Sequence, residues 1–338
     1  MATTRVVVHV GPMKTGTTAL GAYFSAAQSA GILPADIVYP VGDLWFPASG
    51  NITKHGQLAD FLYPEGRHNS GRKTQIQSPD NVARKLRDVA AHVATTAGSR
   101  GTAVFISETL VGQVNLERLV EQLNVAFDEV AFVLAVRSPV EAAQSLLVHK
   151  IKEWRSRHVD FDLYAMLRNR DGSLDYDYQR MISTLRQLPI DTFLLIPYFE
   201  EESDGYAVVD RFMKVVTGKS AIRLDNDFGS RRIHPSLPLP SLKRLVTVKK
   251  MKSLLGGVPF LASILHSLFL RILNADRSKV MRAGFNARSS DSGDWVISPA
   301  ERARILALYG NLGADLRKAL GAQSTQADWR SWFKATGL

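Results

Sequence analysis

Short apolar runs recur along the chain, and most are followed by a segment with helical spacing. Four of these runs cover residues 5–10, 103–107, 129–136 and 192–196, and they are rich in valine, leucine, isoleucine and phenylalanine. Continuous apolar runs of this length are typical of strands that are buried on both faces of a parallel sheet. We therefore predict four buried strands at these positions.

The segments between these runs predict helices. After Thr17 the apolar residues Leu20, Tyr23, Phe24 and Ala27 fall on one helical face. Further helices are expected over residues 81–96, 116–123, 174–188 and 207–216, and one begins at Pro139, since proline is favoured in a first helical turn. Strands that alternate with helices predict an α/β fold, with a parallel sheet flanked by helices on both faces.

Two stretches depart from this alternation. Residues 31–80 are rich in Gly, Pro, Asn and Ser and predict a long excursion with short helices. Residues 233–282 begin with three prolines and continue into a basic stretch and a mostly apolar one over 254–273, which Gly256, Gly257 and Arg271 interrupt. These interruptions make a poor membrane span. We expect one α/β domain over 1–338, with 233–282 as a basic helical insertion or lobe within it.

The positive charge of the chain is local. The 338 residues are 45% hydrophobic and 22% charged, which excludes a disordered chain, and the net charge is +10. Residues 231–282 hold 11 basic residues and one acid, Asp276, so this segment carries the whole net charge. Two interpretations stay open: a packed helical pair with a solvated basic face, or a lobe that rests on an anionic membrane surface or grips an anionic acceptor.

Several classes of site are absent from the sequence. There is no cysteine, so disulfides and thiolate metal sites are excluded. Paired histidines at helical spacing are also missing, and no metal is expected. The first residues lack the apolar stretch and cleavage site of a signal peptide, so we expect a cytoplasmic protein, membrane-associated under the second interpretation of 233–282.

A glycine loop connects the first strand to the first helix. It reads Gly11-Pro12-Met13-Lys14-Thr15-Gly16-Thr17-Thr18. Such a turn presents backbone N–H groups and the positive end of the helix dipole at one point, which favours a phosphate. The glycines have the spacing of the mononucleotide loop, but Thr17 occupies its lysine position and the lysine is Lys14. We predict a P-loop-like sheet whose loop binds a phosphate other than a triphosphate with magnesium.

Residues 12–18 resemble the Pro-x-Lys-[Ser/Thr]-Gly-Thr-Thr loop of the sulfotransferases that use 3′-phosphoadenosine-5′-phosphosulfate (PAPS), in particular bacterial, carbohydrate-sulfotransferase-like members. In that family the loop grips the 5′-phosphosulfate and its lysine contacts the bridging oxygen, where negative charge builds as the sulfuryl group leaves. The resemblance implies that Lys14 is catalytic. It also implies that the whole loop binds PAPS, namely Pro12, Met13, Lys14, Thr15, Gly16, Thr17 and Thr18.

A second motif supports the first. The run Arg137-Ser138-Pro139 ends the third strand, and Ser145 follows eight residues after the arginine. This segment resembles the strand-Arg-x-Pro-helix element of the same family, which implies that Arg137 and Ser145 hold the 3′-phosphate of PAPS. The planar guanidinium group suits this role because it meets a phosphate with paired hydrogen bonds. Farther along the same helix, His149, Lys150 and Lys152 either line the acceptor side or form a solvated face.

Three residues are candidates for the base that takes the acceptor proton. Glu108 directly follows the second strand, at the edge where parallel sheets place their ligands. In the resembled family a histidine or glutamate at a strand end supplies the base, and a partly buried glutamate can gain the raised pKa that this role needs. His55 is the rival, as base or as an acceptor-binding residue. Asp43 is the third candidate.

Together these motifs imply transfer of a sulfuryl group from PAPS to a hydroxyl or amine by in-line displacement. We expect a saccharide or glycolipid acceptor, and neither magnesium nor nucleic acid as a partner. One alternative is a P-loop nucleotide kinase-like phosphotransferase, which predicts a lysine beside Thr17 and a strand-ending aspartate for magnesium. Another is a non-catalytic module that binds anionic glycans on the same fold, which predicts a broken cofactor site.

Overall fold

The computed structural model describes residues 3–12, 15–46, 55–58, 78–97, 100–107, 110, 116–153, 167, 176–199, 206–224, 239–255, 259–282, 298–336 and 338. These residues separate into two compact units. The first unit comprises Met1–Arg137, Tyr178–Gly229 and Asn311–Leu338, and the second comprises Ser138–Asp177 and Ser230–Gly310. Each unit is described by itself below.

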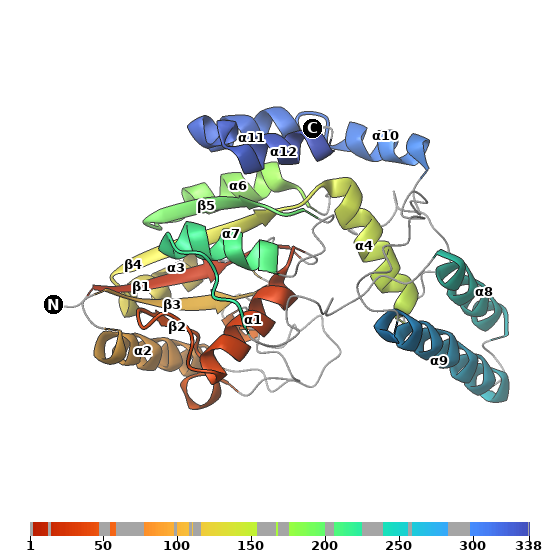
Figure 1. Ribbon diagram of the computed structural model, residues 1–338, viewed down its shortest axis with the longest axis horizontal. Coiled ribbons are helices and arrows are strands. Elements are labelled where there is room, and N and C mark those ends of the chain that lie inside the picture. Colours follow the sequence, from red (N-terminus) through yellow and green to blue (C-terminus); the bar gives the residue numbers. More distant parts are fainter. Residues whose placement is uncertain are drawn as a thin grey trace. The chain divides into compact units, whose positions relative to one another are not determined.

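The first unit is built on a parallel sheet (Figure 1). In the described residues its strands are β1 (Thr3–His9), β2 (Ile37–Val38), β3 (Arg100–Ile106), β4 (Glu129–Val136) and β5 (Thr192–Pro197), in the order β2-β3-β1-β4-β5. Every neighbouring pair is parallel. The four strands predicted from apolar runs are confirmed, with ends shifted by a few residues. The two-residue β2 was not predicted.

Helices cover both faces of this sheet, as the α/β prediction requires (Figure 1). The helices α1 (Thr17–Ser29) and α7 (Tyr206–Thr217) share one core with alternate strand residues such as Val7 and Val133. The intervening strand residues are equally buried, and α2 (Pro79–Thr96) and α3 (Leu116–Ala126) pack on that side. Because successive side chains of a strand point to opposite faces, a run buried at every position needs cover on both.

Several shorter elements complete the first unit. The 3-10 helix η1 (Gly42–Leu44) lies in the predicted excursion, and α6 (Tyr178–Gln187) lies within the predicted 174–188. At the C-terminal side follow α11 (Leu312–Leu320), η3 (Gly321–Thr325) and α12 (Ala327–Thr336), which the sequence reasoning did not anticipate. Of these, α12 packs on β5, and α11 packs on α6.

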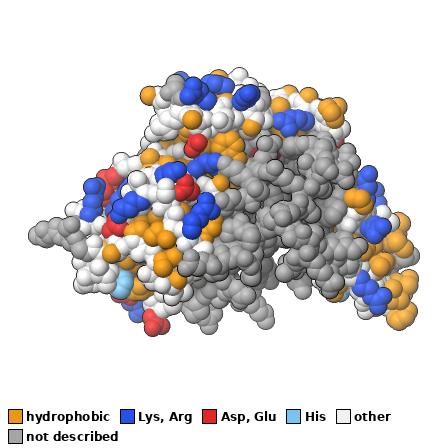
Figure 2. Space-filling model, in the orientation of Figure 1, with side chains coloured by type: hydrophobic (Ala, Val, Ile, Leu, Met, Phe, Trp, Pro, Cys, Tyr) orange, Lys and Arg blue, Asp and Glu red, His pale blue; other side chains and the backbone are white. Residues whose placement is uncertain are grey.

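The second unit is helical in its described residues. It contains α4 (Pro139–Lys152), α8 (Leu239–Leu255), α9 (Pro259–Arg282) and α10 (Pro299–Leu308). The helix α8 packs on both α9 and α4, so the stretch 233–282 contains a packed helical pair. Basic and hydrophobic side chains share the visible surface over α8 and α9 (Figure 2). In the described part of the chain, no helix is long and apolar enough to cross a membrane.

Candidate functional site

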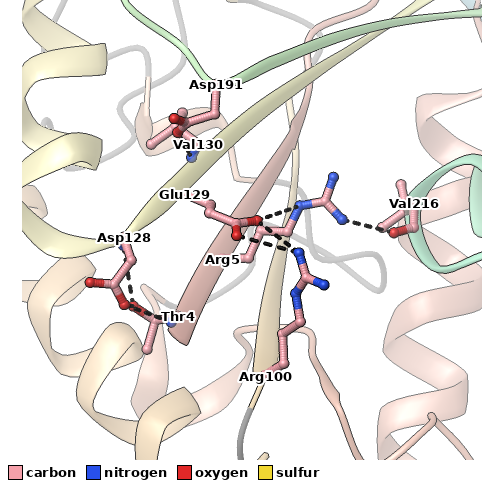
Figure 3. Close-up of polar contacts among 8 residues, drawn as sticks. All are labelled: Thr4, Arg5, Arg100, Asp128, Glu129, Val130, Asp191 and Val216. Atoms are coloured by element: carbon pink, nitrogen blue, oxygen red, sulfur yellow. Dashed lines mark hydrogen bonds and ion pairs between the residues drawn. The ribbon is translucent and has the colours of Figure 1, made fainter. Parts of the chain in front are cut away.

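Polar contacts hold the amino ends of the strands in register (Figure 3). The backbone N–H and the hydroxyl of Thr4 donate to Asp128 Oδ2 at 2.7 and 2.8 Å, which ties the start of β1 to the residue before β4. Arg5 and Arg100 both pair with Glu129, at 3.8 and 3.3 Å. Because the strands are parallel, their carboxyl ends lie at the opposite edge of the sheet, which is where α/β proteins place their ligands.

At that carboxyl edge the glycine loop and Arg137 lie on adjacent strands. The strand β1 ends at His9, immediately before the loop, and β4 ends at Val136, immediately before Arg137. His9 is opposite Val133 in the parallel register, and the Val10 N–H donates to the Val133 carbonyl at 2.9 Å. The sheet thus brings together two motifs that are separated by more than a hundred residues in the sequence.

The loop is too tight for a side chain at its first glycine. A Cβ atom on Gly11 would lie 2.4 Å from Thr15 Oγ1 and 2.7 Å from His9 Cε1. The Thr15 hydroxyl donates to the Pro12 carbonyl at 2.6 Å, which closes the loop on itself. Met13 and Lys14, which lie between these two residues in the sequence, are outside the described residues. This close approach of side chain and backbone accounts for glycine at position 11.

Gly16 opens α1 in a left-handed conformation. Its φ is +88° and it is the N-cap of the helix, with no side-chain cap and no acidic residue in the first turn. Thr17 and Thr18 form the start of α1. A helix N-terminus without an acidic or capping side chain keeps its backbone N–H groups and positive dipole for an anion. The described half of the loop therefore fits a phosphate group.

Arg137 is buried at the adjacent strand end. Only 3% of its surface is exposed, and its backbone N–H donates to the Tyr178 hydroxyl at 2.9 Å. Its guanidinium carbon lies 5.1 Å from the centre of the Tyr198 ring. A cation over an aromatic face is stabilised by the ring quadrupole, most strongly where water is excluded. This geometry orients a buried guanidinium group at the edge where the loop lies.

Tyr198 contacts both halves of the site, and the sequence reasoning missed it. A Cβ atom on Gly16 would lie 3.1 Å from Tyr198 Cε2, so the ring that underlies Arg137 also packs against the loop. The Tyr198 N–H donates to the Val136 carbonyl at 2.8 Å, and its own carbonyl accepts from Trp332 Nε1 at 3.1 Å. Its position two residues after the predicted strand 192–196 is a signal that could identify it.

His55 is completely buried and is bonded to the backbone at both ring nitrogens. Nδ1 accepts from the Ile106 N–H at 3.0 Å, and Nε2 lies 2.9 Å from the Pro40 carbonyl, to which it can only donate. Burial lowers the pKa of His55 to about 4, so the ring is neutral with its proton on Nε2. With both nitrogens engaged, this environment argues for a structural role and against a role as catalytic base.

The other candidate base, Glu108, follows the carboxyl end of β3 in the sequence. Ser107 is buried and its N–H donates to the His9 carbonyl at 3.0 Å, so the chain after β3 leaves the sheet beside the end of β1. Glu108 is the next residue and lies outside the described residues. His9, which the sequence reasoning did not single out, is buried where β1 meets the loop, with its ring 5.9 Å from that of Phe212.

The remaining predicted residues have varied surroundings. Asp43 is exposed on η1. In the second unit Ser145 is half-buried on α4, and His149 Nε2 lies 3.1 Å from Glu153 Oε1 on the last turn of that helix. The described residues contain no cluster of three or more His, Asp or Glu that could hold a metal ion.

Comparisons with known proteins give a similarity to a solved structure. No protein-family model matches this chain, and no curated protein matches it. Among solved structures, a sulfotransferase from Alicyclobacillus acidocaldarius matches with 17% identity and a TM-score of 0.41, over 78% of this chain and 97% of that one. At these values the similarity carries no functional argument, and the assignment of function depends on the site itself.

Proposed function

We propose that this protein is a sulfotransferase that moves the sulfuryl group of PAPS to a hydroxyl or amine of an acceptor. The observation that carries the proposal is the shared edge of β1 and β4, where the glycine loop and a buried arginine both pack on the ring of Tyr198. A donor with phosphates at both the 5′ and the 3′ positions of its ribose needs two such anion sites at a fixed separation. A nucleoside triphosphate needs only the first.

The residues divide between the two ends of the donor. In the proposal the loop from Pro12 to Thr18 holds the 5′-phosphosulfate through its backbone N–H groups and the dipole of α1. Arg137 holds the 3′-phosphate, a role that the family resemblance in the sequence also gives to Ser145. Lys14 occupies the loop position at which a cation offsets the charge that builds on the departing phosphate oxygen.

The proposed reaction conserves atoms and charge without a metal. The acceptor oxygen or nitrogen forms a bond to sulfur while the bond between sulfur and the bridging 5′-phosphate oxygen breaks. Glu108 takes the proton of the acceptor group, because His55 has both ring nitrogens committed to the backbone. The products are the sulfated acceptor and adenosine 3′,5′-bisphosphate.

For the acceptor we propose a saccharide or glycolipid. We expect acceptor specificity to lie in residues 31–80 and 233–282, because these regions are least similar to the resembled family. The second of them is basic. Sugars present the hydroxyl groups that this reaction requires. A screen of saccharides and glycolipids with sulfur-labelled PAPS tests this part separately from donor binding.

Calorimetric titration of the whole chain tests the donor assignment. We expect adenosine 3′,5′-bisphosphate to bind more tightly than either ATP or adenosine 5′-monophosphate. Hydrogen bonds to charged groups predict that Arg137→Ala weakens bisphosphate binding by roughly tenfold to a hundredfold. The same variant should leave the affinity for adenosine 5′-monophosphate unchanged, and Lys14→Ala should weaken the binding of both nucleotides.

The titration with adenosine 5′-monophosphate distinguishes the loss of one contact from damage to the fold. Arg118→Ala, an exposed arginine on α3, serves as the matched control and should bind all three nucleotides as the parent does. Tighter binding of ATP than of the bisphosphate would instead favour the phosphotransferase alternative. If Arg137→Ala bound the bisphosphate as tightly as the parent, the proposal would be wrong.

A further inference from the structure

The helices α8 and α9 form a hairpin that exposes large apolar side chains on either side of its connection. Only residues 256–258 separate the two helices in the sequence, and the helices pack against each other. Leu254, near the end of α8, is 83% exposed, and Phe260, near the start of α9, is 73% exposed. Soluble proteins tolerate single exposed apolar residues, but two large ones flanking the same connection suggest a surface that something covers.

The apolar surface continues from this end along one stripe of α9. Ile264 and Leu268 follow Phe260 at intervals of four residues, and they are 49% and 43% exposed. Residues four apart lie on the same face of a helix, so the three side chains form a continuous strip. On α8, Met251 is also exposed, one turn before Leu254. We call Met251, Leu254, Phe260, Ile264 and Leu268 the hairpin patch.

Exposed cations follow the hairpin patch along the same two helices. Lys243 and Lys250 are exposed on α8, and Arg271 is exposed on α9. Lys243 precedes Leu254 by eleven residues and Arg271 follows Phe260 by eleven, which at the helical rise places each about 16 Å from the apolar end. Figure 2 shows hydrophobic and basic side chains together over this hairpin.

The charge of the hairpin is almost entirely positive, since Asp276 near the end of α9 is its one acidic residue. Residues 239–275 contain six basic residues, listed here in order as Lys243, Arg244, Lys249, Lys250, Lys252 and Arg271, and no aspartate or glutamate. A second copy of the chain would set these cations against one another, which disfavours self-association through this surface. A partner that is negatively charged at its surface and apolar beneath matches both features.

We propose that the α8–α9 hairpin docks on an anionic lipid bilayer. The hairpin patch enters the boundary between headgroups and acyl chains, and Lys243, Lys250 and Arg271 face the phosphate groups of the lipids. Interfacial helices bind in this manner when an apolar face of limited depth is combined with lysine or arginine beside it. This docking is peripheral, and it does not depend on the proposed sulfuryl transfer.

Vesicle flotation of the full chain tests the proposal. The probes are vesicles of phosphatidylcholine alone and of phosphatidylcholine mixed with phosphatidylglycerol. We expect the parent to float with the anionic vesicles, to stay behind with the neutral ones, and to be released by high salt, since screening shortens the reach of the cations. Each cation near an anionic surface contributes roughly a fivefold gain in partitioning, so three contribute on the order of a hundredfold.

Two triple variants separate the apolar and the charged contributions. Leu254→Ser with Phe260→Ser and Ile264→Ser removes most of the hairpin patch, and Lys243→Gln with Lys250→Gln and Arg271→Gln removes the cations. Each should lose flotation with anionic vesicles by at least about tenfold. Matched controls change exposed residues of the first unit: Val125→Ser with Val215→Ser and Ile222→Ser, and Arg87→Gln with Arg118→Gln and Arg330→Gln. The controls should float as the parent does.

Nucleotide titration and thermal unfolding of the same variants show that each is folded. Equal flotation of the hairpin variants and their controls overturns the proposal, as does equal binding of the parent to neutral and anionic vesicles. Self-association that the serine variant abolishes, without vesicle binding by the parent, assigns the patch to a second copy and also overturns it. Because flotation needs no nucleotide, its failure is distinguishable from a failure of the proposed function.

Discussion

Replacement of Gly16 by alanine tests whether the loop is held by its contacts or only by its backbone conformation. The φ of +88° costs an L-residue about 1–2 kcal/mol. In addition, the new methyl group would lie 2.9 Å from Val208 Cγ2 and 3.1 Å from Tyr198 Cε2, and forced overpacking of this kind costs about 1–3 kcal/mol. The two costs together predict that Gly16→Ala lowers the free energy of unfolding of the first unit by about 2–5 kcal/mol.

Gly218→Ala is the matched control. Gly218 has a φ of +71°, but a Cβ atom there meets nothing within 4 Å, so this substitution carries only the conformational cost. The difference between the two variants isolates the contact with Val208 and Tyr198, and it should be about 1–3 kcal/mol. Urea unfolding followed by tryptophan fluorescence is suitable, because Trp45, Trp329 and Trp332 belong to the first unit. If Gly16→Ala destabilises no more than Gly218→Ala, the packing of Tyr198 on the loop is not as described.

Two further predictions concern buried titratable groups. The pKa of His55 falls from 6.5 in the unfolded chain to about 4, so the unfolded state binds more protons between these values. Stability should therefore drop as the pH falls from about 6.5 to about 4, by up to about 3 kcal/mol, and a urea-unfolding profile of His55→Gln should lack this drop. Burial and the nearby Lys252 lower the pKa of Lys249 from 10.5 to about 8, while its Nζ donates to the Lys150 carbonyl at 2.9 Å. The free energy of unfolding of the second unit should therefore rise as the pH rises from about 8 toward 10.5. Unfolding followed by circular dichroism should show no such gain for Lys249→Met. The control Lys250→Met should show the same gain as the parent.

The sheet could be predicted because its strands are buried on both faces. A run such as Glu129–Val136 is apolar at almost every position, and its period, length and boundaries are visible without tertiary information. The strand β2 could not be found in this way, since two residues have no measurable period. In α12, Trp329, Trp332 and Phe333 have the spacing of an apolar helical face, so a signal for this helix is present in the sequence.

The sequence predicts those parts of the candidate site whose residues lie close together in the chain. The glycine loop and the arginine after β4 are each contiguous in the sequence, and the parallel order of strands explains why they meet. The environment of His55 was not predictable, because its burial depends on Pro40 and Ile106, which are distant in the sequence. In the sequence, a histidine in a polar, glycine-rich segment resembles a site residue. Only the structure shows that both ring nitrogens of His55 are hydrogen-bonded to the backbone.

The distribution of charge separates the two proposals. Residues 231–282 carry the entire net charge, so the rest of the chain is neutral and the proposed anion site cannot depend on a general positive field. That site instead relies on features that act at contact distance: a buried guanidinium group on Tyr198 and an uncapped helix N-terminus behind Gly16. The hairpin of α8 and α9 has the opposite character, since its exposed cations act through a screened field. Substitutions in the hairpin should therefore leave nucleotide affinity unchanged, and substitutions at the loop or at Arg137 should leave vesicle binding unchanged.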